Sequence, residues 1–163
     1  MIGLMPSTIE SGVRDQIASE RPRSLLLNVE TAKAGPRILL ADDQEEMLQT
    51  IILVLRDEFN IIGTAENGED AVELTTKLSP DVLVLDISMP ILNGIEAAWR
   101  LKELGSGARV VFLTIHTDSD FVDAAHSAGA LGYVLKDSLA MDLAPAIRAV
   151  LQGNTFTSQA MQV

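Results

Sequence analysis

Cysteine is absent from the 163 residues of this chain, so neither a disulfide framework nor a thiolate metal site can form. No apolar run approaches the roughly 18 residues that cross a bilayer. The N-terminus also lacks the basic stretch and long apolar core of a secretory signal. These absences predict a cytoplasmic protein without a membrane partner.

Basic residues are scarce, because the chain carries 12 Lys and Arg against 23 Asp and Glu, a net charge of −11. Residues 1–36 hold four residues of each sign, so the whole negative charge falls in residues 37–163. A nucleic-acid surface needs clustered Lys and Arg to displace counterions from phosphates. We therefore expect no direct nucleic acid binding by this chain. The acidic body serves either solubility or the docking of a partner.

Short apolar stretches alternate with stretches of helical periodicity along residues 37–153. The predicted strands are 37–41, 60–65, 81–86, 109–114 and 131–135, and the predicted helices are 44–57, 71–78, 94–104, 119–127 and a last helix that ends at Gly153. Strands that alternate with helices form a parallel sheet through right-handed crossovers. The predicted fold is therefore α/β: a doubly wound five-stranded parallel sheet in the flavodoxin-like order 2-1-3-4-5, with helices on both faces.

Pro145 conflicts with a last helix that starts near Leu139. A proline inside a helix removes a hydrogen bond and costs about 3 kcal/mol or more. We therefore expect this helix to start late, with Asp142 as its N-cap and Pro145 in its first turn.

Polar residues follow or end four of the predicted strands. Asp42 and Asp43 follow the first strand and Lys136 follows the fifth, while Asp86 and Thr114 end the third and the fourth. Strands 1, 3 and 4 are neighbours in the predicted order, so these side chains meet at the carboxyl edge of the sheet, where open α/β sheets bind ligands. Three carboxylates at one edge predict a cation site.

Each of these residues also has a purely structural interpretation. Asp42 and Asp43 suit the start of a helix, where acidic residues favour the dipole. A single Lys136 in a loop is usually solvated, and Thr114 is an ordinary residue for the end of a strand. Their joint occurrence at one edge argues against coincidence.

Residues 37–153 resemble the receiver domain of response regulators in two-component signalling. The resemblance rests on Asp42-Asp43, on Asp86 with Met89-Pro90 and Asn93-Gly94 behind it, and on Thr114 and Lys136 at the ends of the corresponding strands. Residues 128–137 are further similar to regulators whose receivers precede a helix-turn-helix output domain.

The resemblance implies that Asp86 takes a phosphoryl group from a histidine kinase or a phosphotransfer protein and forms an acyl phosphate. It implies that Asp43 and Asp86 bind Mg²⁺ directly, Asp42 through water and Ser88 through its carbonyl. Lys136 and the Thr114 hydroxyl would contact the phosphoryl oxygens. Because self-phosphorylation and self-dephosphorylation would be its only reactions, the chain is not expected to be an enzyme.

A conformational output follows from the same resemblance. Thr114 would move toward the phosphoryl group, and Tyr133 would turn from exposed to buried. The face of helix 4, strand 5 and helix 5 would then dock partners, and the resemblance is compatible with a phosphorylation-dependent homodimer. Ile115 is bulkier than the small residue often found beside the switch hydroxyl, which predicts slower phosphoryl entry and loss. His116 is either a loop residue or one that crowds the attacking water.

Three classes of function remain. The first is this phosphoacceptor module, and the second is a binding module that works through protein contacts irrespective of phosphorylation. The third is an aspartate-nucleophile phosphatase of haloacid-dehalogenase type. Such phosphatases carry a second Asp two residues after the first, where this chain has Ser88.

Residues 1–36 match no pattern, and we expect a flexible N-terminal extension, with a docking segment as the alternative. Residues 154–163 are expected to be a C-terminal tail too short for an output domain. The chain is therefore expected to be a stand-alone receiver or a truncated transcriptional regulator.

Overall fold

The computed structural model of this protein describes residues 34–159. The predicted N-terminal extension therefore lies outside the described residues except for its last three positions, as do residues 160–163 of the predicted tail. The described strands are β1 (Arg37–Ala41), β2 (Asn60–Ala65), β3 (Val82–Leu85), β4 (Arg109–Thr114), β5 (Gly132–Leu135) and β6 (Phe156–Thr157). The helices are α3 (Glu45–Leu55), α4 (Gly68–Leu78), α5 (Gly94–Glu103), α6 (Ser119–Ser127) and α7 (Leu139–Leu151), with a 3₁₀ turn, η1 (Lys136–Ser138), before α7.

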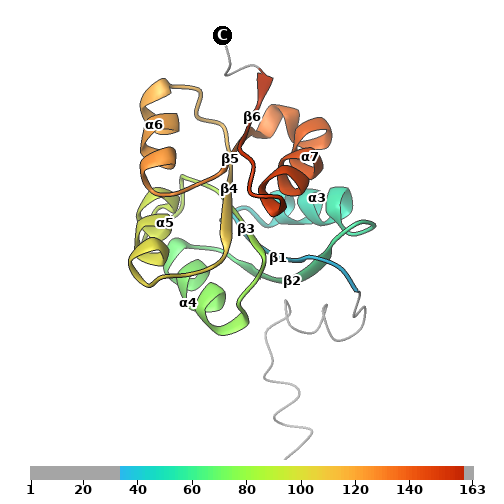
Figure 1. Ribbon diagram of the computed structural model, residues 1–163, viewed down its shortest axis with the longest axis horizontal. Helices are drawn as coiled ribbons and strands as arrows, with labels where there is room; N and C mark the ends of the chain where they lie inside the picture. The colour runs from blue at the N-terminus through green and yellow to red at the C-terminus, as the bar shows by residue number, and fades with distance from the viewer. Residues whose placement is uncertain (1–33, 160–163) are drawn as a thin grey trace, which may run out of the picture.

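The strands form one sheet in the order β2-β1-β3-β4-β5-β6 (Figure 1). All pairs are parallel, and β1 and β3 are in register from Ile38↔Val82 to Ala41↔Leu85. The predicted order of the first five strands is confirmed. Strand β6 was not predicted; it adds two residues of the expected tail to the edge of the sheet beside β5.

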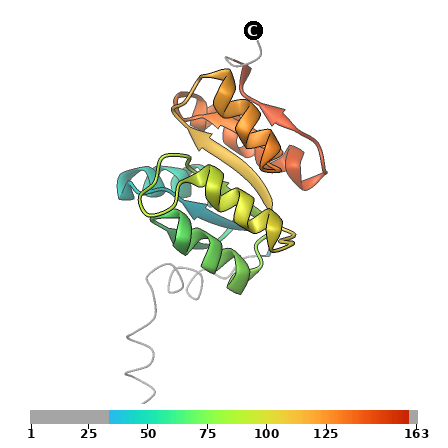
Figure 2. The same cartoon turned by 90° about the vertical axis from the view of Figure 1, so that its left-hand side faces the viewer.

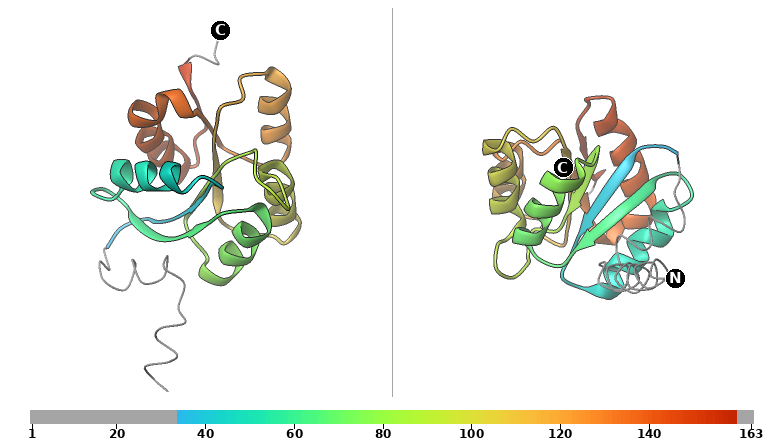
Figure 3. Two further views of the ribbon diagram at one scale, coloured as in Figure 1. Left: turned by 180° about the vertical axis from the view of Figure 1, so that it is seen from behind. Right: turned by 90° about the horizontal axis from the view of Figure 1, so that it is seen from below.

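Helices cover both faces of the sheet. In Figure 1, α4, α5 and α6 lie on one face and α3 and α7 on the other, and Figures 2 and 3 show the same layers from other sides. Side chains of β1 point alternately to the two faces of the sheet. Leu39 therefore lies in the core on the side of α4, α5 and α6, and Ile38 and Leu40 lie in the core on the side of α3 and α7. The central strand β3 is apolar throughout because both of its faces are buried.

The late start predicted for the last helix is wrong. Helix α7 begins at Leu139, not after an N-cap at Asp142, and Pro145 lies inside it. Starting at Leu139 buries that side chain against the same core as Leu143 and Ile147. Tertiary packing of the apolar face thus outweighs the hydrogen bond that Pro145 cannot donate.

The Asn93-Gly94 pair sets the start of α5 and holds it close to the functional edge. The Asn93 side chain accepts a hydrogen bond from the Glu96 amide (2.9 Å), which caps the helix. A Cβ at Gly94 would overlap the carbonyl oxygen of Asp86. Glycine is therefore required for the first turn of α5 to pack on the backbone of Asp86.

Candidate functional site

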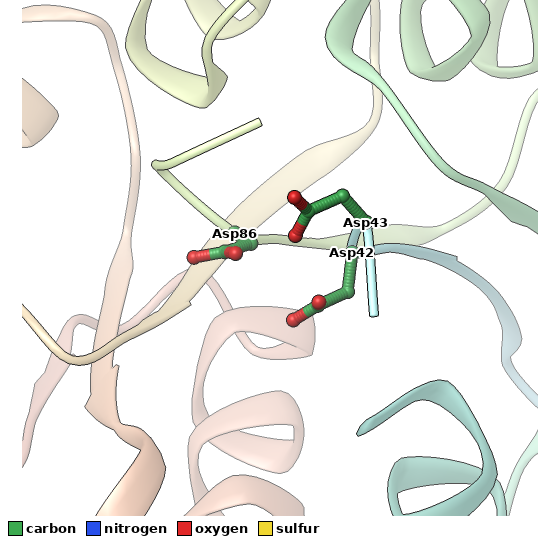
Figure 4. Close-up of side chains that lie close together, drawn as sticks. All are labelled: Asp42, Asp43 and Asp86. Carbon is green, nitrogen blue, oxygen red and sulfur yellow. The ribbon is translucent and has the colours of Figure 1, made fainter. Parts of the chain in front are cut away.

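Three aspartates from two adjacent strands meet at the carboxyl edge of the sheet. Asp42 and Asp43 directly follow β1. Asp86 directly follows β3, the strand that pairs with β1. Ligand atoms of all three lie within 4.8 Å of one another, and Figure 4 shows their carboxylates gathered together. Asp42 and Asp86 are buried, whereas Asp43 is exposed. The cluster is thus open to solvent on one side.

Lys136 joins the two buried carboxylates from the end of β5. Its Nζ lies 2.8 Å from Asp42 Oδ2 and 3.2 Å from Asp86 Oδ2, and its side chain is only 10% exposed. The other Asp42 oxygen accepts a hydrogen bond from the Gln44 amide (2.9 Å), near the start of α3. Lys136 is therefore a partner of the cluster and not a solvated loop lysine.

The cluster has more negative than positive charge. Burial and the neighbouring Asp42 raise the pKa of Asp86, and Lys136 offsets this only in part. Burial acts to lower the pKa of Lys136, but the hydrogen bond to Asp42 and the charges of both aspartates outweigh it, so that the pKa is raised. One ammonium group faces three carboxyl groups, an arrangement that a bound cation relieves.

Thr114 lies at the end of β4, the strand next to β3, and is fully buried. Its Oγ1 accepts a hydrogen bond from the His116 amide (3.2 Å). Among the described residues, this bond is made with its own loop and not with the aspartates. An oxygen that accepts from one amide keeps its own O–H to donate elsewhere.

Tyr133 is 1% exposed and packs in the core on the side of α4, α5 and α6. Its hydroxyl donates a hydrogen bond to the His116 carbonyl (2.8 Å), and burial raises its pKa to about 12. The tyrosine is thus already buried in this structure, whereas the predicted switch turns it from exposed to buried, so its role as a switch residue stays a prediction.

His116 connects more of the site than the sequence indicates. Besides its amide bond to Thr114 and its carbonyl bond to Tyr133, its Nε2 lies 2.7 Å from Ser88 Oγ. Its ring stacks on Phe121 with the centroids 4.1 Å apart. Only its place two residues after Thr114 could have indicated this role, because the contacts depend on the path of the loop after β4.

Ser88 lies in the loop after β3 and is exposed. With Asp43 and His116 it lines a cleft beside the aspartate cluster. The contact that the structure gives for Ser88 involves its hydroxyl, so the ligand role of its carbonyl stays a prediction.

Residues 38–148 match the family described as response regulator receiver domain. The chain belongs to this family. The predicted membership and fold are thus confirmed, and the family assignment favours a signalling domain over a phosphatase. Receiver domains bind Mg²⁺ at an acidic pocket, and this chain has a cluster of three aspartates at the carboxyl edge of its sheet.

Relatives of this receiver domain include whole regulators and single domains. It is 37% identical over 122 residues to the transcriptional regulatory protein DegU of Brevibacillus brevis, and the match covers 74% of this chain and 52% of DegU. It is 38% identical over 115 residues to the chemotaxis protein CheY of Halobacterium salinarum, covering 71% of this chain and 96% of that protein. The chain thus spans about half the length of DegU and most of CheY.

A solved structure of a LuxR-family two-component response regulator from Aurantimonas has a TM-score of 0.74 to this receiver. The two are 31% identical, and the match covers 79% of this chain and 94% of the other. Among residues 34–159, no helix is long and apolar enough to cross a membrane.

Proposed function

We propose that this receiver domain takes a phosphoryl group from a histidine kinase or a phosphotransfer protein onto Asp86, in the presence of Mg²⁺. The observation that carries the proposal is that the Asp86 carboxylate lies 3.2 Å from the Lys136 ammonium group and within one cluster with two further aspartates. Response regulators receive phosphoryl groups from histidine kinases, and the assignment of Asp86 to this role is our own.

The donor set fits a hard divalent cation, because it consists of oxygen atoms from three carboxylates on two strand ends. We assign direct binding to Asp43 and Asp86, water-mediated binding to Asp42, and a carbonyl ligand to Ser88. When bound, Mg²⁺ supplies positive charge that neutralises the phosphoryl oxygens and the carboxylates together.

In the proposed reaction, an Asp86 carboxylate oxygen attacks the phosphorus atom of a phosphohistidine. An O–P bond forms to Asp86, the P–N bond breaks, and the electron pair returns to the imidazole of the donor. Lys136 holds its ammonium group beside the Asp86 carboxylate and would place positive charge on the phosphoryl group. These residues act by positioning and by charge neutralisation.

The Thr114 hydroxyl donates to a phosphoryl oxygen in the phosphorylated form. Because the same hydroxyl accepts from the His116 amide, and the His116 carbonyl accepts from Tyr133, movement of Thr114 changes the loop that holds the tyrosine. The change reaches the predicted docking face, whose fourth helix, fifth strand and fifth helix are α6, β5 and α7. There we place the docking of partners and a phosphorylation-dependent homodimer.

Incubation with phosphoramidate tests the proposal by intact mass spectrometry. We expect the wild-type chain to gain one phosphoryl group only when Mg²⁺ is present, and Asp86→Ala to gain none. Absence of an adduct, together with failure to bind beryllofluoride, would instead support a module that works without phosphorylation. Sedimentation with and without beryllofluoride tests the homodimer.

A further inference from the structure

The chain that follows α7 reaches the functional edge of the sheet through Ser158. This residue comes directly after β6 and is fully buried. Its amide donates to the carbonyl of Tyr133 (2.9 Å), and its hydroxyl accepts from the amide of Leu135 (3.1 Å). One residue beyond the predicted domain boundary thus contacts β5 on both sides of Val134, through its amide at Tyr133 and through its hydroxyl at Leu135, the neighbour of Lys136.

The hydroxyl of Ser158 ends a series of hydrogen bonds between β5 and β6. The carbonyls of Leu131 and Tyr133 accept from the amides of Phe156 and Ser158. The amide of Leu135 faces the same edge of β5, and the oxygen it meets belongs to a side chain instead of the main chain. The anchoring of the last residue of β5 on this edge therefore depends on one serine hydroxyl.

Leu135 directly precedes Lys136, where β5 ends and η1 begins. Without the hydroxyl, the Leu135 amide would lose its partner in a buried position, and the chain would relieve this by shifting toward another acceptor or water. A shift of about 1 Å in a positioning group can slow a reaction about 100-fold. The Lys136 ammonium group, at 2.8 and 3.2 Å from two carboxylates, has little room for such a shift.

We propose that Ser158 is a positioning residue for Lys136: its hydroxyl fixes the end of β5 and thereby places the ammonium group at the phosphoacceptor site. This inference rests on the proposed function of Asp86. It assigns to the segment after α7 a part in the phosphorylation chemistry.

The first experiment compares initial rates of phosphorylation by phosphoramidate at saturating Mg²⁺. We expect Ser158→Ala to react about 10-fold more slowly than wild type, and Ser158→Thr, which keeps the hydroxyl, to recover most of the rate. Phe156→Ala is the matched control, because it weakens the packing of β6 and leaves the serine in place. We expect this control to stay within about 2-fold of wild type.

A double-mutant cycle separates positioning from general loss of structure. If Ser158 acts through Lys136, then Ser158→Ala has no further effect on the rate in a Lys136→Met background. Hydrogen exchange at the Leu135 amide gives a readout without phosphorylation, and it should accelerate in Ser158→Ala but not in Ser158→Thr.

The outcomes are distinguishable. A wild-type chain that gains no phosphoryl group overturns the proposed function, and with it the role of Ser158. If the wild-type chain reacts, three results overturn the role of Ser158 alone: Ser158→Ala reacts as fast as wild type, Phe156→Ala reacts as slowly as Ser158→Ala, or the effects of the Ser158 and Lys136 substitutions on the rate are additive.

Discussion

Lys136→Met removes the ammonium group between Asp42 and Asp86 but keeps an apolar side chain of similar length. In the wild type, Nζ lies 2.8 and 3.2 Å from the two carboxylates, whose side chains are 1% and 6% exposed. Removing one partner of a buried ion pair costs about 3–5 kcal/mol, because the charge left behind is desolvated and unpaired.

The lower end of that range applies here. Asp43 is exposed, and the cluster is open on that side, so water and ions reach it. We therefore expect Lys136→Met to lower the free energy of unfolding by about 3 kcal/mol in buffer with EDTA, which corresponds to a fall in Tm of roughly 10 °C for a domain of this size.

Mg²⁺ should reduce this deficit. The ammonium group and the metal ion are both attracted to the same carboxylates, so the variant is expected to bind Mg²⁺ more tightly than wild type. Each tenfold gain in affinity narrows the stability gap by about 1.4 kcal/mol at saturating Mg²⁺.

Urea unfolding with EDTA and with saturating Mg²⁺ gives the four free energies that are needed. Lys77→Met is the matched control, because Lys77 pairs with Glu73 on the exposed surface of α4, and we expect it to behave as wild type. The reasoning is refuted if Lys136→Met is as stable as wild type in EDTA, or if Mg²⁺ stabilises both chains equally.

Three further changes test other parts of the site. Burial and Asp42 raise the pKa of Asp86 above its ordinary 3.8, so the stability contributed by the neutral carboxyl is complete below that value and is lost as pH rises through the folded pKa. Without Mg²⁺, Asp86→Asn should therefore gain stability relative to wild type between pH 4 and pH 7. A difference in the free energy of urea unfolding that does not change with pH contradicts this. Ile115→Ala should speed both phosphorylation and autodephosphorylation a few-fold, roughly 1 kcal/mol in each barrier, because Ile115 is 69% exposed beside Thr114; unchanged rates by mass spectrometry rule out the crowding effect. Tyr133→Phe should cost about 1 kcal/mol of stability by leaving the His116 carbonyl without its donor, and equal urea midpoints would show that this bond contributes nothing.

The order of the first five strands could be predicted because each strand is a short apolar stretch and each is followed by a stretch with helical periodicity. Five of the site residues follow or end a strand, so their placement needed only the sheet order. The sequence therefore predicted that Asp42, Asp86 and Lys136 meet, but not that Lys136 lies closer to Asp42 than to Asp86. That difference depends on the turn of η1, which strand periodicity does not determine.

The errors have local causes. Strand β6 has two residues, too few for any period, and it exists because β5 offers it an unpaired edge. The start of α7 was misplaced because the helix penalty of Pro145 was weighed without the core that Leu139 enters. In both cases tertiary contacts outweigh a local signal.

His116 connects parts of the site whose residues come from different strand ends, and this connection suits the switch that we propose. The sheet pairs Leu85 with Phe112 and Phe112 with Tyr133, so the strands beside Asp86 are held in register and the loops are the parts that can move. The loop after β4 contacts the Thr114 hydroxyl, the Tyr133 hydroxyl and the Ser88 hydroxyl through this single residue. A displacement of Thr114 therefore cannot occur without changing at least one contact to the strand that carries Tyr133. The loop that carries Ser88 contacts the same residue, so we expect a displacement of the loop after β4 to alter the loop after β3 as well.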